Sequence, residues 1–338
     1  MVGRAVLKVA PATIGRPVMV AVGGDSGSGK TTLVRGLYRI FGAERITNLC
    51  LDDYHKLDRA ERKRLGVTAL NPAANDIELM ERQVAAIARG EIVSKPTYDH
   101  STGTFGPHEE VDPREIVVIR GLFPLLTASL RSAFDVRVWL QPQEELKWAW
   151  KVKRDCAERG YSVPQVIRQI VDRLDDHRQY LAPQREQADI RVQFYPPPGY
   201  FRAGTAVDDD AHLNVRLRLG AGLPHLDLDD VLASAGRDDP PPIRLEPEAD
   251  APGASILEID GNVSPSRALE LDERIWAHME THRHLRPDEI GSYLDGSVER
   301  HSDPLALTQL LIAYHVVQAK LERGLTFKAS AAQATVSG

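Results

Sequence analysis

The run from Gly24 to Thr31 constrains this chain more than any other feature. Its sequence, Gly-Asp-Ser-Gly-Ser-Gly-Lys-Thr, matches the phosphate-binding loop pattern G-x-x-x-x-G-K-[ST] at every defined position. The apolar run Val18–Val22 precedes it, and apolar residues at helical spacing follow from Leu33 to Ile40. The loop is therefore expected between a buried strand and a helix N-terminus, where inward-pointing amides and the helix dipole favour phosphate groups.

The chemistry of this loop predicts a bound nucleoside triphosphate, which we take to be ATP with Mg²⁺. Lys30 would reach the β and γ phosphates, and the Thr31 hydroxyl would ligate the metal. A glycine-rich turn with a chance lysine is the alternative, and the complete match disfavours it. The predicted nucleotide-binding residues are Gly24, Asp25, Ser26, Gly27, Ser28, Gly29, Lys30, Thr31 and Thr32. Because GTPases and ATPases use the same loop for hydrolysis, a phosphate acceptor has to be identified elsewhere.

Composition excludes several other classes of protein. The 338 residues carry a formal net charge of −6, which disfavours a partner such as duplex nucleic acid. The two cysteines, Cys50 and Cys156, form no metal-type pair and indicate a reducing compartment. No apolar stretch reaches the length of a membrane span, and the N-terminus lacks a secretory signal pattern. We therefore expect a cytoplasmic protein with no membrane or nucleic-acid partner.

Hydrophobic periodicity predicts an α/β fold of the P-loop NTPase type, with a mostly parallel sheet, helices on both faces and a C-terminal α+β extension. Short apolar runs alternate with amphipathic segments through the first half of the chain, as βαβ units require. The predicted strands are Val18–Val22, Ile46–Leu51, Ile116–Ile119, Val136–Leu140 and Ile190–Phe194, and the predicted helices are Thr31–Phe41, Asp76–Arg89, Glu144–Glu158 and Val163–Tyr180.

The pattern changes after the Pro196-Pro197-Pro198-Gly199 run. We predict a P-loop kinase core over residues 14–200, an irregular, strand-containing extension over 201–262, a C-terminal helical region over 263–330 and a disordered tail over 331–338. The extension should hold strands Leu213–Leu219 and Ser255–Ile259, and the C-terminal region helices Ala268–Met279 and Leu305–Lys320. Ser302, followed by Asp303 and Pro304, is a favourable N-cap for the last helix.

Two carboxylates, Asp52 and Asp53, follow the second predicted strand. In open parallel sheets ligands bind beyond the carboxyl ends of the strands, so this pair is expected beside the phosphate loop. One carboxylate there can accept the proton of a substrate hydroxyl, and another can help to hold a metal. A solvated acidic loop that caps a helix, as Asp58 could, is the alternative. We favour the catalytic interpretation.

Several motifs in series resemble the phosphoribulokinase family of P-loop kinases, which phosphorylate ribulose 5-phosphate with ATP. The resemblance covers roughly the first two hundred residues. Uridine and pantothenate kinases share the phosphate loop but not the whole series. The segments are Gly24–Thr31, Cys50–His55, Gly66–Pro72, Lys95–Gly103 and Trp150–Gly160, and the runs His284–Gly291 and Ser302–Gln309 resemble bacterial members.

The resemblance implies roles for individual residues. Asp52 would be the base for the 1-hydroxyl of the sugar phosphate, and we also assign it, with Thr31, to the metal site. Lys30 and Arg159 would be catalytic cations. The implied substrate-binding residues are Asp53, His55, Arg59, Lys63, Tyr98, His100, Lys151 and Arg154, the last two in a lid segment with Arg159. Exposed basic helix faces are the alternative for Arg59, Lys63 and the lid, and a packed loop residue is the alternative for Tyr98. The resemblance also implies a homodimer.

Two positions depart from the family pattern. Redox-regulated members carry a cysteine in the phosphate loop that pairs with the one before Asp-Asp-Tyr-His, whereas this chain has Ser28 there and keeps only Cys50. A switch through that disulfide is therefore excluded. Arg120 stands where the family has a metal-linked glutamate, and an arginine cannot bind Mg²⁺. A kinase for another small hydroxylated acceptor, such as a nucleoside, and a catalytically impaired nucleotide-binding regulator therefore stay open as alternatives.

Overall fold

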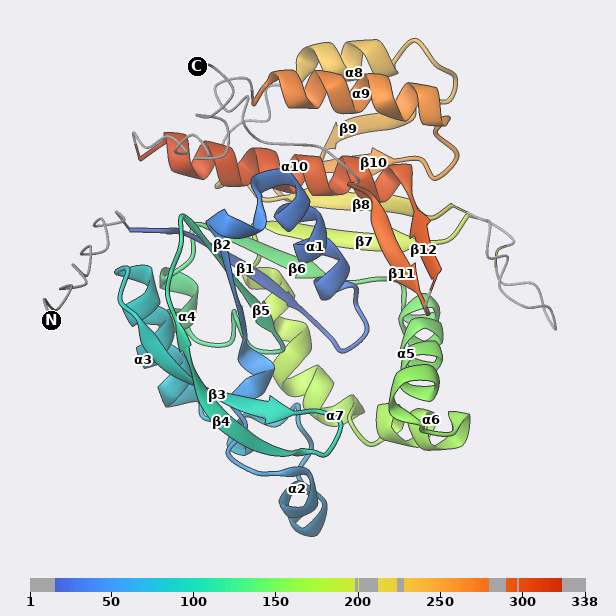
Figure 1. Cartoon of the computed structure of the whole chain (residues 1–338). Coiled ribbons are helices and arrows are strands. Elements are labelled where there is room, and N and C mark those ends of the chain that lie inside the picture. Colours follow the sequence, from blue (N-terminus) through green and yellow to red (C-terminus); the bar gives the residue numbers. More distant parts are fainter. Residues whose placement is uncertain are drawn as a thin grey trace, which may run out of the picture.

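An eight-stranded sheet forms the centre of the molecule in the computed structural model, which describes residues 16–197, 200, 212–223, 228–279, 290–296 and 298–323 (Figure 1). The strand order is β2-β5-β1-β6-β7-β8-β10-β9. The first five in that order are parallel to one another: β2 (Ile46–Cys50), β5 (Ile116–Gly121), β1 (Val18–Gly24), β6 (Val136–Leu140) and β7 (Ile190–Tyr195). The predicted parallel α/β sheet is confirmed.

Continuous apolar runs build the middle of this sheet because both of its faces are covered. Every residue of β1 is buried, and Val20 pairs with Val118 on one side and Val136 on the other. Helices α1 (Lys30–Phe41) and α10 (Asp303–Leu321) pack with Val18, Val20 and Val22 on one face. On the other face Met19 and Ala21 pack in a cluster that includes α3 (Ile77–Ala88) and α4 (Ala128–Ser132).

The segment after β7 extends the same sheet with antiparallel strands. These are β8 (Asn214–Leu219), β10 (Ser255–Ile259) and β9 (Ile243–Pro247), and helices α8 (Asp229–Ala235) and α9 (Pro265–Ala277) lie above them (Figure 1). Strands and buried residues therefore continue across the predicted boundary at residue 200 without a break in the sheet. The division into separate domains remains a prediction, and the predicted disordered tail lies outside the described residues.

Helix α10 is buried on nearly its whole circumference, as expected of a helix that is apolar all round. Ser302 is its N-cap, since the Ser302 Oγ atom accepts a hydrogen bond from the amide of Leu305 at 3.4 Å. Among the described residues, no helix is both long and apolar enough to cross a membrane.

The predicted helix Val163–Tyr180 is wrong beyond its middle. Helix α6 (Val163–Val171) is followed by α7 (Leu174–Asp176) and a π-helix (His177–Leu181). Asp176 anchors the segment after the break, because its carboxylate accepts hydrogen bonds from the hydroxyl of Thr68 at 2.6 Å and the side-chain amide of Asn71 at 3.1 Å. These tertiary contacts hold the segment that contains Asp176, although apolar residues at helical spacing continue through it in the sequence.

Several further elements had no sequence prediction. Hairpin β3–β4 (Val93–Asp99 and Thr104–Val111) and hairpin β11–β12 (Ser292–Asp295 and Val298–His301) lie outside the large sheet. Helix α2 (Arg59–Leu65) follows the acidic segment. The predicted helix Glu144–Glu158 is confirmed, by contrast, as α5 (Glu144–Arg159) after β6. Short 3₁₀ helices cover Ala43–Arg45, Leu51–Asp53, Pro72–Ala74 and Ala182–Gln187.

Candidate active site

The phosphate loop leaves β1 and enters α1 as the sequence predicts. Gly27 and Gly29 have φ angles of +86° and +92°, which L side chains rarely adopt. A Cβ atom on Gly27 would also lie 3.3 Å from the Cβ atom of Lys151 in α5. Glycine is therefore needed at Gly27 for the turn and for the close approach of α5.

Lys30 points back into the loop. Its ammonium group donates to the carbonyl oxygens of Gly24 at 2.8 Å and Asp25 at 2.7 Å, and the residue is only 7% exposed. Burial lowers the pKa of Lys30, and the nearby carboxylates of Asp52 and Asp25 oppose that shift.

The loop has the donors that a triphosphate needs. The amides of the first helical turn, from Lys30 onward, have no acceptor within the helix, and Thr31 is exposed there. The buried hydroxyl of Ser28 has no hydrogen-bond partner within the described part of the chain. Thr32 lies further back, where its carbonyl accepts a hydrogen bond from Gln309 at 3.2 Å. This donor set fits the phosphates of ATP, and Thr31 and Asp52 offer oxygen atoms to Mg²⁺.

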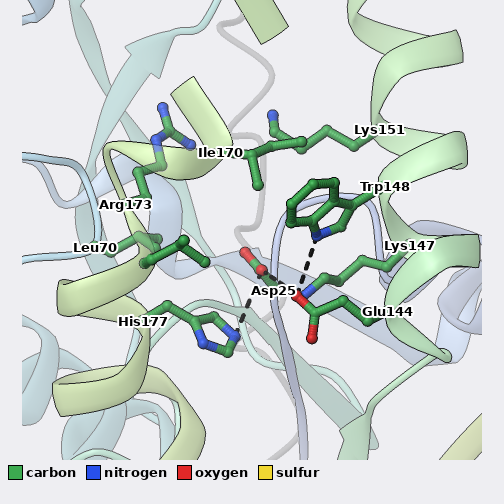
Figure 2. A pocket seen from close by; sticks show the side chains of 10 residues that line it. Asp25, Leu70, Glu144, Lys147, Trp148, Lys151, Ile170, Arg173 and His177 are labelled. Carbon is green, nitrogen blue, oxygen red and sulfur yellow. Dashed lines mark hydrogen bonds and ion pairs between the residues drawn. The ribbon is translucent and has the colours of Figure 1, made fainter. Parts of the chain in front are cut away.

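Asp25 ties the phosphate loop to two helical segments. Its carboxylate lies 3.2 Å from the ammonium of Lys147 in α5 and 3.6 Å from His177 Nε2 in the π-helix (Figure 2). Burial raises the pKa of Asp25, but Lys147 and His177 outweigh it, so the net shift is downward. These groups line a cavity of about 30 Å³, and sequence reasoning identified neither Lys147 nor His177.

Asp52 is fixed in the turn that follows β2. Its Oδ1 atom accepts a hydrogen bond from the amide of Leu122 at 3.0 Å. Gly121 makes this possible, since a Cβ atom there would lie 2.9 Å from Leu51 Cβ and 3.0 Å from Asp52 Oδ1. The carboxyl ends of β2 and β5 thus place one carboxylate beside the phosphate loop, as the sequence predicts.

The neighbouring carboxylate, Asp53, is bound to the β3–β4 hairpin. It accepts a hydrogen bond from the ammonium of Lys95 at 2.6 Å, and Lys95 also pairs with Glu109 at 2.7 Å. The amide of Tyr98 donates to Asp53 at 3.4 Å. Asp53 therefore positions the hairpin, and its predicted contact with substrate remains a prediction.

The β3–β4 hairpin places Tyr98 and His100, two of the predicted substrate-binding residues, in a cluster with His55. The ring centroids of His55 and Tyr98 are 4.6 Å apart, and those of Tyr98 and His100 are 5.1 Å apart. His55 Nδ1 lies 2.7 Å from the side-chain oxygen of Asn75. Burial, and then the charge of Arg62, lower the pKa of His55 to about 4, so the ring is neutral at pH 7.

Three of the four cations of helix α2 differ in what they contact. Arg59 donates to the carbonyl oxygens of Ser101 at 3.1 Å and His100 at 2.5 Å, so its guanidinium group holds the hairpin turn. Lys63 is exposed, with no side-chain partner among the residues described. Arg62, which sequence reasoning did not select, donates to Tyr98 Oη at 2.8 Å and lies 5.3 Å from the centre of that ring.

The three cations predicted for a lid lie around one buried carboxylate that sequence reasoning missed. Asp155 has no solvent exposure and pairs with Lys151 at 2.5 Å, Arg154 at 2.7 Å and Arg159 at 3.3 Å. Arg154 also donates to Ser26 Oγ of the phosphate loop at 3.1 Å. The i, i+4 spacing of Lys151, Asp155 and Arg159 was the available signal.

Arg120 lies in β5, in register with Val22 of β1 and Cys50 of β2. Alternation along β5 puts it on the α1 face, where its charge contributes to the lowered pKa of Lys30. Within the described residues it forms no ion pair with Asp52 or Asp53. Cys50 and Cys156 are free thiols, and burial raises the pKa of Cys50 to about 12.

Comparison with known proteins shows which family this chain resembles. Residues 19–198 match the sequence model of the phosphoribulokinase / uridine kinase family. The chain is 45% identical over 181 residues to the phosphoribulokinase of Synechocystis sp., which covers 54% of each chain. It is 30% identical over 195 residues to the uridine kinase of Brevibacillus brevis, which covers 56% of this chain and 89% of that one. The chain thus spans about half the length of the curated phosphoribulokinases it matches.

The solved structure of phosphoribulokinase from Rhodobacter spheroides has a similar fold. The TM-score is 0.55 at 19% identity, and the match covers 78% of this chain and 97% of that one. The fold similarity therefore extends beyond the segment that the sequence family covers.

Proposed function

The chain belongs to the phosphoribulokinase / uridine kinase family, and from that premise we propose that it transfers the γ-phosphate of ATP to ribulose 5-phosphate. The product would be ribulose 1,5-bisphosphate. The observation that carries the proposal is the Asp52 carboxylate, which the amide of Leu122 holds at the carboxyl edge of the sheet near Lys30. The 45% identity to a phosphoribulokinase supports this acceptor over others.

Each group at the site has a role in this proposal. Lys30 and the first-turn amides of α1 bind the β and γ phosphates of ATP. Thr31 and Asp52 would hold Mg²⁺, which when bound would neutralise phosphate charge. Asp52 accepts the proton of the substrate hydroxyl as that oxygen attacks the γ-phosphorus, and the bond from the γ-phosphorus to the bridging oxygen breaks to release ADP. Lys151, Arg154 and Arg159 neutralise the charge that spreads over the equatorial oxygens during transfer.

The acceptor would bind between Asp52 and the cluster of His55, Tyr98 and His100. The charge of Asp52 raises the pKa of His55 and of His100. Burial outweighs this effect, so both pKa values are lowered overall. A neutral His55 can donate or accept a hydrogen bond with a sugar hydroxyl. We also propose, from the family resemblance and the sparse cysteines, that the protein is a cytoplasmic homodimer.

A second candidate is a nucleoside kinase. The 30% identity to a uridine kinase over 89% of that protein favours it. A third candidate is a nucleotide-binding regulator that has lost phosphoryl transfer. It is favoured by Arg120, which stands in place of the family's acid and adds positive charge near Lys30.

Coupled measurement of ADP release separates these candidates. We expect turnover with ribulose 5-phosphate, Mg²⁺ and ATP, and no turnover with uridine. Turnover with uridine alone would assign the second function. ATP binding by calorimetry without any acceptor-dependent ADP release would assign the third.

A further inference from the structure

We propose that Lys147 of α5 is a positioning residue for the phosphate loop, which acts on bound ATP through the carboxylate of Asp25. This inference rests on the ATP use in the proposed function and is independent of the acceptor. Sequence reasoning placed Asp25 among the nucleotide-binding residues and did not select Lys147. The Asp25 side chain points toward α5 (Figure 2), so its effect on the nucleotide would be indirect.

The two carboxylate oxygens of Asp25 have different partners. Oδ1 accepts a hydrogen bond from the amide of Ser26 at 2.6 Å, which is a contact within the loop. Oδ2 lies 3.2 Å from the ammonium of Lys147 and 3.6 Å from His177 Nε2. The second separation is too long for a hydrogen bond, and burial lowers the pKa of His177, so this ring is neutral at pH 7. Lys147 is therefore the main counter-ion of Asp25.

The surroundings of Lys147 direct it to Asp25. Both side chains line the same cavity of about 30 Å³, which has room for one or two water molecules and not for a nucleotide (Figure 2). The ammonium of Lys147 also lies 3.6 Å from the carboxylate of Glu144, one turn earlier in α5. The Glu144 side chain is 60% exposed, so solvent screens that pair more than it screens the pair with Asp25.

Asp25 lies within electrostatic reach of the phosphate-binding lysine. Its backbone carbonyl accepts a hydrogen bond from the Lys30 ammonium at 2.7 Å, and its charge raises the pKa of Lys30 against the effect of burial. Lys30 is the residue expected to contact the β and γ phosphates. An unpaired Asp25 carboxylate would repel a triphosphate there, with weak screening, because the side chain is only 22% exposed. Pairing with Lys147 offsets that repulsion.

The same face of α5 contacts the next two residues of the loop. Arg154, seven residues or about two turns after Lys147, donates a hydrogen bond to Ser26 Oγ at 3.1 Å. Between them, the Cβ atom of Lys151 lies 3.3 Å from the position that a Cβ atom on Gly27 would take. Successive loop residues therefore follow one face of the helix, and the ion pair of Lys147 is the first contact in that series.

The test is a double-mutant cycle in which the non-hydrolysable analogue adenylyl imidodiphosphate is titrated with Mg²⁺ into each protein by calorimetry. We expect Lys147→Gln to raise the Kd about 10-fold, because it leaves a carboxylate unpaired near the triphosphate. Asp25→Asn keeps the shape and the acceptor for Ser26, and should leave the Kd within about three-fold of the parent. In the Asp25→Asn background, Lys147→Gln should raise the Kd less than about two-fold.

Lys153→Gln is the matched control, because Lys153 is a lysine of the same helix whose partner is Asp295 of β11. Its Kd should equal that of the parent. A rise in Kd that is equal in both Asp25 backgrounds would show that Lys147 acts on the nucleotide without Asp25. An unchanged Kd in Lys147→Gln would show that the ion pair has no effect on nucleotide binding. Either result overturns the proposal.

Failure of the proposed function has a separate signature. The titrations contain no acceptor, so a parent that does not turn over ribulose 5-phosphate can still show the expected coupling between Lys147 and Asp25, which would support the inference for another acceptor. A parent that does not bind the analogue overturns it. A folding defect in Lys147→Gln would lower the binding stoichiometry and leave the Kd unchanged, and that result also overturns the proposal.

Discussion

The amide of Leu122 donates a 3.0 Å hydrogen bond to the Oδ1 atom of Asp52. These residues are 70 positions apart and meet because β2 and β5 are parallel neighbours whose carboxyl ends share one edge of the sheet. The bond fixes the orientation of the carboxylate that we propose as the base and as a metal ligand.

Asp52→Asn should lower kcat by at least about 100-fold and leave the KM for the sugar phosphate within a few-fold of the parent. An amide keeps the shape and the acceptor for Leu122 but cannot take a proton. Steady-state kinetics with both substrates measure this. A variant with nearly parental kcat and a strongly raised KM would make Asp52 a binding residue.

Gly121→Ala should reduce both stability and turnover. The new methyl group would meet Leu51 Cβ at 2.9 Å and Asp52 Oδ1 at 3.0 Å, at a φ angle of +156°. We expect a loss of about 1–3 kcal/mol in the free energy of unfolding and a fall in kcat larger than any change in the KM for ATP. Urea unfolding and kinetics check it. Gly66→Ala, where nothing lies within 4 Å of the new Cβ atom, separates backbone strain from contact with Asp52.

Arg120→Glu should raise acceptor-dependent ATP turnover or lower the Mg²⁺ concentration required. Among the described residues Arg120 has no carboxylate partner to lose, and its charge lies near Lys30. A glutamate there would restore an oxygen ligand for the metal. Titration of Mg²⁺ at fixed ATP measures the effect. Loss of a robust parental activity would place Arg120 in the working site instead.

Activity should be nearly equal after incubation with reduced and with oxidised dithiothreitol. Ser28 offers no thiol to Cys50, and burial raises the pKa of Cys50 to about 12, so the thiol stays protonated and unreactive. A large, reversible loss on oxidation would show that Cys50 pairs elsewhere, with Cys156 or between subunits.

His315 should make the fold sensitive to acid. It is 2% exposed in α10, and neither ring nitrogen has a hydrogen-bond partner among the described residues. Burial lowers its pKa to about 4. The unfolded chain therefore binds more protons between pH 6.5 and 4, so stability is present above pH 6.5 and is lost as the pH falls through that window.

We expect this residue to account for about 2 kcal/mol of the stability lost between pH 7.5 and 5. Urea unfolding at the two pH values should show that His315→Leu loses less free energy of unfolding on acidification than the parent does. The exposed control His108→Gln should lose as much as the parent. If His315→Leu lost as much free energy of unfolding on acidification as the parent, the assignment to His315 would be contradicted. His55, whose pKa is also lowered to about 4, accounts for a further part of the loss.

Local patterns in the sequence determined the phosphate loop, the parallel strands and the position of Asp52. A phosphate loop is a continuous motif, and fully buried strands are continuous apolar runs, so both can be read without knowledge of distant residues. The N-cap at Ser302 is equally local. Helix Val163–Tyr180 was wrong beyond Val171, and the segment after that point is held by bonds from Asp176 to Thr68 and Asn71, which are distant in the sequence.

Only the tertiary structure decided what each charged side chain contacts. Arg59 and Arg62 lie on one short helix and are chemically alike, yet Arg59 binds the carbonyls of the hairpin turn and Arg62 stacks on Tyr98. Asp155 forms ion pairs with three cations, and Asp53 accepts a hydrogen bond from Lys95. These contacts form because the fold brings the groups close together. Sequence spacing fixes which face of an element a side chain occupies, whereas the partner on that face depends on packing between elements far apart in the chain.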